Sequence, residues 1–194
     1  MSDSPNLIKQ SQERRFSAHN TLLHIARLEL EVSKAGSVDE FNHAFTSLTL
    51  SALAVEALAN AVGERVVPDW KDFESASPFA KLRLLAERLL VPFAGGAEPW
   101  QTIRWLCRFR NLVAHAKPEL VIRDEILSQE EHELRGGAAP LSKLELLVTE
   151  ANARRAFNAV EAIKYSLYDG VPPGERFGLA HDAWLNSSEL HDGA

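Results

Sequence analysis

The stretch SVDEFNHAFTSLTLSALAVEALANAVG, residues 37–63, decides the fold that we expect for this chain. Its first four residues, Ser37 to Glu40, form a capping-box pattern that favours the first turn of a helix. Beyond them, apolar side chains recur from Phe41 to Val62 around most of the helix circumference, and a helix of this kind buries most of its surface. The stretch therefore predicts a central helix that ends at or soon after Gly63.

The flanking sequence predicts more helices, because apolar residues again recur at helical spacing while strand-like alternation is scarce. Several of these helices have recognisable ends: serine followed by proline favours a helix start, and glycine or proline favours a stop. We therefore expect four helices besides the central one, over about residues 7–34, from Ser77-Pro78, from Glu98-Pro99 to Pro118, and over about residues 149–169 before Gly170.

Two segments lack a clear helical period. Residues 119–142 mix scattered apolar side chains with a polar, acidic run, and they predict an irregular insertion in which a short strand pair or hairpin is one option. Residues 171–194 are rich in turn-forming residues, and we expect a tail that docks one short helix through Phe177, Leu179, Trp184 and Leu185. The predicted class is all-α: a bundle of four to five main helices in one domain, residues 1–170, followed by that tail.

The composition is typical of a soluble protein in a reducing compartment. Of the 194 residues, 45% are hydrophobic and 25% are charged, which suits one domain with a buried core. The single cysteine, Cys107, excludes an intrachain disulfide, and the first residues lack the basic and apolar regions of a signal peptide. Glu56 and Asn60 interrupt the longest apolar stretch, Leu48 to Val62, so no membrane span is expected and the predicted location is cytoplasmic.

The candidate chemistry lies in one run, Arg110-Asn111-Leu112-Val113-Ala114-His115, near the end of the helix that Pro118 is expected to terminate. The planar guanidinium of arginine clamps phosphates through paired donors, and histidine moves protons near neutral pH. Arginine, asparagine and then histidine at this spacing arise by chance in such a composition with a probability of about 2%. A formal net charge of −6 argues against a broad nucleic-acid-binding surface but allows a local basic site.

Helix geometry adds a second argument. Spacings of four, three and four residues place four polar side chains on one face, namely Arg104, Arg108, Asn111 and His115. A different stripe is expected to supply the packing face, formed by Trp105, Phe109, Leu112 and Ala116. Two interpretations of the arginine-rich face stay open: a phosphate-binding surface, or a solvated face on which the histidine merely caps the helix end.

The run of residues 110–115 near a helix end, inside a small all-α domain, resembles the HEPN superfamily (higher eukaryotes and prokaryotes nucleotide-binding). The resemblance covers roughly residues 15–168 in layout, and its only specific part is the short motif. Residues 52–60 of the preceding helix, the segment 78–82 and Lys117-Pro118 after the motif supply supporting context.

This resemblance implies a metal-independent endoribonuclease of a toxin, phage-defence or RNA-processing system, or else an inactive binding or scaffolding module. It implies that Arg110 and His115 are the catalytic pair, that Asn111 is the polar residue after the arginine, and that no cofactor is needed. It also implies a homodimer with facing motif helices, and a protein partner such as an antitoxin or a nucleotidyltransferase. In one toxin subgroup the nucleotidyltransferase modifies a tyrosine two residues beyond the histidine; this chain has Lys117 there.

Cleavage of RNA by its 2′-hydroxyl needs a base, an acid and positive charge at the phosphate. We assign proton transfer to His115 and stabilisation of the phosphate to Arg110, with Asn111 orienting one or the other. Three further cations are expected to widen a basic cleft for RNA: Arg104, Arg108 and Lys117. One helix supplies one histidine, so this hypothesis requires two copies of the chain to form the site.

The other chemistry-bearing residues favour structural roles. Glu56 and Asn60 lie one turn apart on the central helix, where a carboxylate needs a cation, and an arginine of the motif helix is the expected donor. Orienting the catalytic pair is the alternative role for these two residues. Cys107 is expected to be a core thiol. The run Glu130-Glu131-His132-Glu133 lacks the spacing of a zinc site, and no metal site is predicted.

Overall fold

The computed structural model describes residues 7–33, 39–135 and 138–191, and the chain is mostly helical, as predicted. Five helices form the bundle: α1 (Ala18–Val32), α2 (Glu40–Val66), α3 (Pro78–Arg88), α4 (Trp100–Ala114) and α7 (Glu150–Gly170). The remaining elements are the helices α5 (Gln129–Arg135) and α6 (Lys143–Leu147), the 3-10 turns η1 (Trp70–Phe73) and η2 (Pro173–Glu175), and the strands β1 (Leu7–Arg15) and β2 (Ala183–His191).

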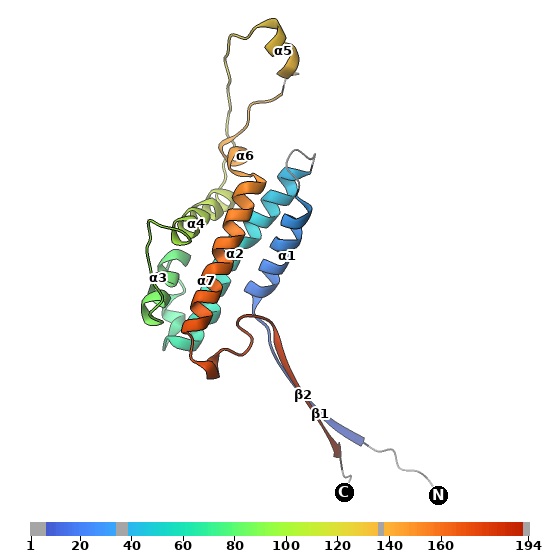
Figure 1. Cartoon of the computed structure of the whole chain (residues 1–194), viewed down its shortest axis with the longest axis vertical. Coiled ribbons are helices and arrows are strands. Elements are labelled where there is room, and N and C mark those ends of the chain that lie inside the picture. Colours follow the sequence, from blue (N-terminus) through green and yellow to red (C-terminus); the bar gives the residue numbers. More distant parts are fainter. Residues whose placement is uncertain (1–6, 34–38, 136–137, 192–194) are drawn as a thin grey trace, which may run out of the picture.

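Helix α2 is the centre of the bundle and contacts α1, α3, α4 and α7 (Figure 1). Its side chains Leu48, Val55 and Leu58 are at most 2% exposed and belong to an apolar cluster to which those four helices also contribute. Burial on several sides explains why this helix is apolar around most of its circumference. The predicted central position is confirmed. Of the predicted capping box, Ser37 and Val38 lie outside the described residues.

Local signals set several helix ends as predicted. The Ser77 hydroxyl accepts a hydrogen bond from the Ala80 backbone N–H at 3.3 Å and starts α3. The Thr149 hydroxyl accepts one from the Asn152 backbone N–H at 3.2 Å and starts α7, which ends at Gly170. The motif helix α4 differs, because it ends at Ala114 and not at Pro118.

Gly63 has a packing role in α2. The helix continues past it to Val66, while the ring of Trp70 lies against the glycine: a Cβ at residue 63 would lie 2.2 Å from Trp70 Cε2. Trp70 itself is only 5% exposed and belongs to the core cluster. The absence of a side chain at residue 63 therefore lets η1 fold back onto α2.

The two ends of the chain form a two-stranded ribbon, and here two sequence-based predictions are wrong. Strand β1 pairs antiparallel with β2, with Leu7 opposite His191 and Arg15 opposite Ala183. Residues 7–15 are thus a strand and not the start of the first helix. Trp184 and Leu185 lie in β2 and not in a docking helix, whereas Leu179 does dock, since it is 2% exposed and belongs to the core cluster. Trp184 is 78% exposed, since the ribbon projects from the bundle (Figure 1).

The physical reason is that the ribbon depends on distant pairing. Residues 7–15 are mostly polar and carry no apolar stripe that a helix could bury against the core. Their partner strand lies near the opposite end of the sequence and satisfies the backbone donors and acceptors instead. The ribbon also joins the predicted tail to the predicted domain; the boundary at residue 170 stays a prediction.

The insertion after α4 projects from the end of the bundle opposite the ribbon (Figure 1). The strand pair offered as one option for residues 119–142 is wrong for the described residues of this segment, which hold α5 and otherwise irregular chain. The acidic run of residues 129–133 forms α5, where Gln129 and Glu133 are hydrogen-bonded one turn apart. A capping box between Ser142 and Glu145 then starts α6.

Among the described residues, α2 is the one helix long and apolar enough to cross a membrane. Its most apolar 18-residue window has a mean hydropathy of 1.4, and half of that window is buried inside the protein. A buried core helix passes the same test of length and composition, so this is weak evidence for a membrane span.

Candidate functional site

Helix α4 carries the motif, and its buried side differs from the predicted one. The buried residues are Trp100, Thr102, Ile103, Leu106 and Phe109. Of the predicted packing stripe, Phe109 is buried and Trp105 partly buried, whereas Leu112 is 38% exposed and Ala116 is exposed. The prediction is wrong for the last turn because the packing side passes through Val113, which packs against the core, and because the helix ends before Ala116.

Arg110 points from α4 toward the central helix. Its Nη2 donates to Glu56 Oε2 at 2.7 Å, and its Nη1 donates to the side-chain oxygen of Asn111 at 3.4 Å. The predicted pairing of Glu56 with an arginine of the motif helix is confirmed. The charge-assisted bond fixes the orientation of the guanidinium, whereas an unpaired arginine on a helix surface would sample many orientations.

A buried lysine that the sequence reasoning does not single out completes the cluster. The Lys81 side chain, on α3, is 1% exposed; its Nζ lies 3.7 Å from Glu56 Oε1 and donates to Asn60 Oδ1 at 3.1 Å. Glu56 and Asn60 therefore do face one neighbourhood, as predicted. The available signal was the position of Lys81, one helical turn before Leu85 on the buried side of α3.

The cluster of Glu56, Lys81 and Arg110 contains two cations and one carboxylate, so it keeps one positive charge. Glu56 accepts from Arg110 and lies near Lys81, and the Arg110 side chain remains 37% exposed. Guanidinium has five N–H donors, of which the bonds to Glu56 and Asn111 use only part. The remaining donors and the surplus charge are available to an anion at the surface.

His115 lies just beyond the helix, in the C-cap position. Its backbone N–H donates to the Asn111 carbonyl at 3.1 Å, and its side chain is exposed, as is that of Lys117. Within the described chain no hydrogen bond or ion pair joins Arg110 to His115. One copy thus holds the arginine firmly and presents the histidine to solvent.

Arg104 and Arg108, the other predicted phosphate-binding residues of α4, do not contact the cluster of Glu56, Lys81 and Arg110 in the described structure. Arg104 stacks on the ring of Phe79, with its Cζ 4.8 Å from the ring centroid, so it covers α3 and faces away from the motif end. Arg108 is exposed and forms no hydrogen bond or ion pair with another described residue. The four residues predicted to share one exposed face, Arg104, Arg108, Asn111 and His115, are all exposed.

Cys107 behaves as a partly buried thiol. Burial raises the pKa of the Cys107 thiol to about 11, an effect that the nearby positive charge of Arg110 only partly opposes. A thiolate is therefore scarce at neutral pH, which agrees with the predicted core role. For the described residues, no group of three or more His, Cys, Asp or Glu side chains has an arrangement that holds a metal ion.

Comparison of the chain with family models, curated proteins and solved structures finds no match. The resemblance to the HEPN superfamily therefore continues to depend on the motif and its place at the end of α4. A function for this chain has to be inferred from the geometry of the cluster formed by Glu56, Lys81 and Arg110, and from the exposed His115 beside it.

Proposed function

We propose that this chain is a metal-independent endoribonuclease that cleaves RNA by attack of the 2′-hydroxyl at a site shared by two copies. The observation that carries the proposal is the Arg110 guanidinium, which Glu56 and Asn111 hold in a cluster with a surplus positive charge, at the helix end that presents His115. A positioned cation next to an exposed imidazole is the minimal requirement for phosphoryl chemistry without a metal.

Each motif residue has a defined task in this proposal. Arg110 binds the scissile phosphate through donors that Glu56 leaves free, and His115 removes the 2′-hydroxyl proton or protonates the departing 5′-oxygen. Asn111, already bonded to Arg110, supports its orientation. Arg108 and Lys117 attract the RNA backbone, while Arg104 contributes only at a distance.

The proposal includes a homodimer. One copy offers a single motif histidine, and that side chain has no bond to Arg110 of its own chain. A two-fold axis beside the exposed last turn of α4 would supply one histidine as base and the other as acid. A cytoplasmic location and a role in a toxin or phage-defence system belong to the same proposal.

The test is cleavage of a mixture of structured and single-stranded RNAs in the presence of EDTA. His115→Ala is expected to abolish cleavage without changing the melting temperature, because the side chain is exposed beyond the helix end. His132→Ala is the matched control, since it removes an exposed histidine from α5. Products of the unmodified protein should end in 2′,3′-cyclic phosphates.

Two outcomes contradict this proposal. Equal cleavage by the His115→Ala and His132→Ala variants would assign the activity to a contaminant or to another site. A strict monomer in light scattering at the concentration at which RNA is cleaved would exclude the shared site.

The second candidate is a non-catalytic module that binds RNA, a nucleotide or a protein such as an antitoxin or a nucleotidyltransferase. The observation that favours it is the same 2.7 Å bond from Arg110 to Glu56, which is sufficient by itself to explain why an arginine stands there. Fluorescence anisotropy with labelled RNA separates the two candidates. A binding module binds RNA without producing shorter products. In that case the unmodified protein and His115→Ala both show no cleavage.

A further inference from the structure

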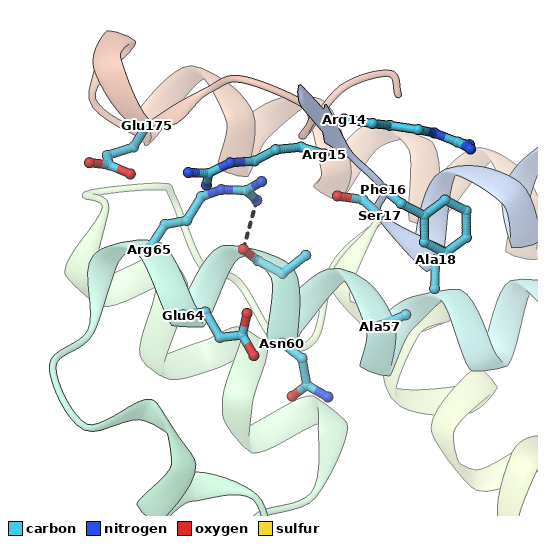
Figure 2. A pocket seen from close by; sticks show the side chains of 11 residues that line it. Arg14, Arg15, Phe16, Ser17, Ala18, Ala57, Asn60, Glu64, Arg65 and Glu175 are labelled. Atoms are coloured by element: carbon cyan, nitrogen blue, oxygen red, sulfur yellow. Dashed lines mark hydrogen bonds between the residues drawn. The ribbon is translucent and has the colours of Figure 1, made fainter. Parts of the chain in front are cut away.

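A second basic site lies at the base of the ribbon, against the C-terminal half of α2. A pocket of about 820 Å³ is bounded by the end of β1, the chain leading into α1, and the last turns of α2 (Figure 2). Its charged lining consists of Arg14, Arg15, Arg65, Glu64 and Glu175. The volume is in the range of small-molecule sites in proteins.

Arg65 is held rigidly on one wall of this pocket. Its Nη1 donates to the Ala61 carbonyl at 2.8 Å and its Nη2 donates to the Phe177 carbonyl at 3.1 Å. Its Nε–H is buried and has no hydrogen-bond partner. The two backbone bonds use one hydrogen on each Nη, so one N–H on each Nη is left for a ligand.

Arg15 is positioned by the same turn that contacts Arg65. Gly178 has a φ of +74°, and a Cβ there would lie 2.7 Å from Arg15 Cβ and 3.1 Å from the Arg15 carbonyl oxygen. The glycine thus lets the end of β1 approach closely. The Ser17 hydroxyl adds a 2.8 Å bond to the Gly178 carbonyl, which ties the following residues to the same turn.

The Arg15 and Arg65 side chains both line this pocket, and the charge of Arg15 acts on Arg65 (Figure 2). Among the described residues, Arg15 and Arg65 form no ion pair, whereas Arg14 pairs with Asp182 at 2.9 Å. Burial and then the charge of Arg15 lower the pKa of Arg65, while Glu64 and Glu175 act in the opposite direction from a distance. Two neighbouring like charges are unfavourable unless an anion joins them.

We propose that this pocket binds a phosphate group between Arg15 and Arg65. Each guanidinium offers donors that match phosphate oxygens, and a phosphate would accept from the Nη hydrogens of Arg65 that the Ala61 and Phe177 carbonyls leave free while neutralising both charges. The phosphate belongs either to a small molecule or to the end of a nucleic-acid strand. Neither of these arginines belongs to the motif, although Asn60, which accepts a hydrogen bond from Lys81, also lines the pocket.

The test is isothermal titration calorimetry with inorganic pyrophosphate at constant ionic strength. Saturable binding of one pyrophosphate per chain is expected, weakened about tenfold or more in Arg15→Gln and in Arg65→Gln, because each substitution removes charge-assisted bonds. Arg154→Gln is the matched control, since it removes one positive charge from the exposed side of α7 and should leave binding unchanged. If Arg65→Gln does not fold, the exposed Arg15 still decides the result.

A second arm identifies the carrier of the phosphate. A 2′-O-methyl RNA trinucleotide with a 5′-phosphate is compared with its 5′-hydroxyl twin, neither of which can be cleaved through a 2′-hydroxyl. Tighter binding of the phosphorylated trinucleotide than of pyrophosphate assigns the site to a strand end, and weaker binding assigns it to a small phosphorylated molecule. Absence of saturable pyrophosphate binding, or equal binding by the unmodified protein and Arg15→Gln, overturns the proposal.

Discussion

Replacing Glu56 by glutamine is expected to lower the free energy of unfolding by about 3 kcal/mol, because it removes the counter-charge of a buried lysine. Lys81 Nζ is 3.7 Å from the Glu56 carboxylate, and its side chain is 1% exposed. After the substitution the ammonium keeps only the bond to Asn60. Breaking a fully buried pair costs about 3–5 kcal/mol, and the lower end applies because the Glu56 side chain is 29% exposed.

The complementary change, Lys81→Met, is expected to cost only about 1 kcal/mol, since Glu56 retains Arg110 at 2.7 Å and methionine fills the apolar site. The double variant should then be more stable than the sum of the two losses implies, by about 1–2 kcal/mol. This non-additive free energy would show that Glu56 and Lys81 interact as an ion pair. Two independent packing defects would give additive losses.

Urea unfolding followed by tryptophan fluorescence measures all three variants. The midpoint should fall while the dependence on urea stays constant, and the melting temperature of Glu56→Gln should drop by about 6–12 °C. A loss below about 1 kcal/mol, or strictly additive effects in the double variant, would refute the reasoning that the carboxylate compensates a buried charge.

Two further changes test the core. His19 is fully buried and its pKa is lowered to about 4, chiefly by burial, so between pH 6.5 and 4 the unfolded chain takes up a proton that the folded protein refuses. Lowering the pH from about 7.5 to about 5 should reduce the free energy of unfolding of the unmodified protein by about 2 kcal/mol more than it reduces that of the His19→Gln variant, as measured by urea unfolding. Equal losses in the two proteins would contradict this. Gly63→Ala should cost at least about 2 kcal/mol in thermal unfolding, because the new Cβ meets Trp70, while Gly96→Ala, with no atom within 4 Å of its Cβ, should cost nothing.

The helices of the bundle were predictable because their signals are local. The apolar circumference of α2, the serine cap of α3 and the threonine cap of α7 lie within the segments that they organise. The β1–β2 ribbon was not predictable, because the partner of residues 7–15 lies at residues 183–191, near the other end of the sequence. Pairing over such a distance has no signature in either polar segment alone.

The same division holds for the candidate sites. The pairing of Glu56 with an arginine on α4 followed from one interrupted apolar helix, because a carboxylate there requires a cation. Lys81 was missed, since a lysine on a short amphipathic helix is usually solvated and only its burial shows otherwise. The positions of Arg15 and Arg65 depend on the turn at Gly178, and the sequence around either arginine does not predict this turn.

The unequal constraint on the two motif residues sharpens the choice between enzyme and binding module. Arg110 is anchored through Glu56 to a buried lysine, whereas His115 sits free beyond the helix end. If Arg110 serves only the fold, Glu56→Gln lowers stability but leaves RNA binding and cleavage intact at temperatures where the variant is folded. If Arg110 holds a phosphate, loosening its anchor also raises KM or lowers kcat there, because the guanidinium must be ordered anew at each encounter.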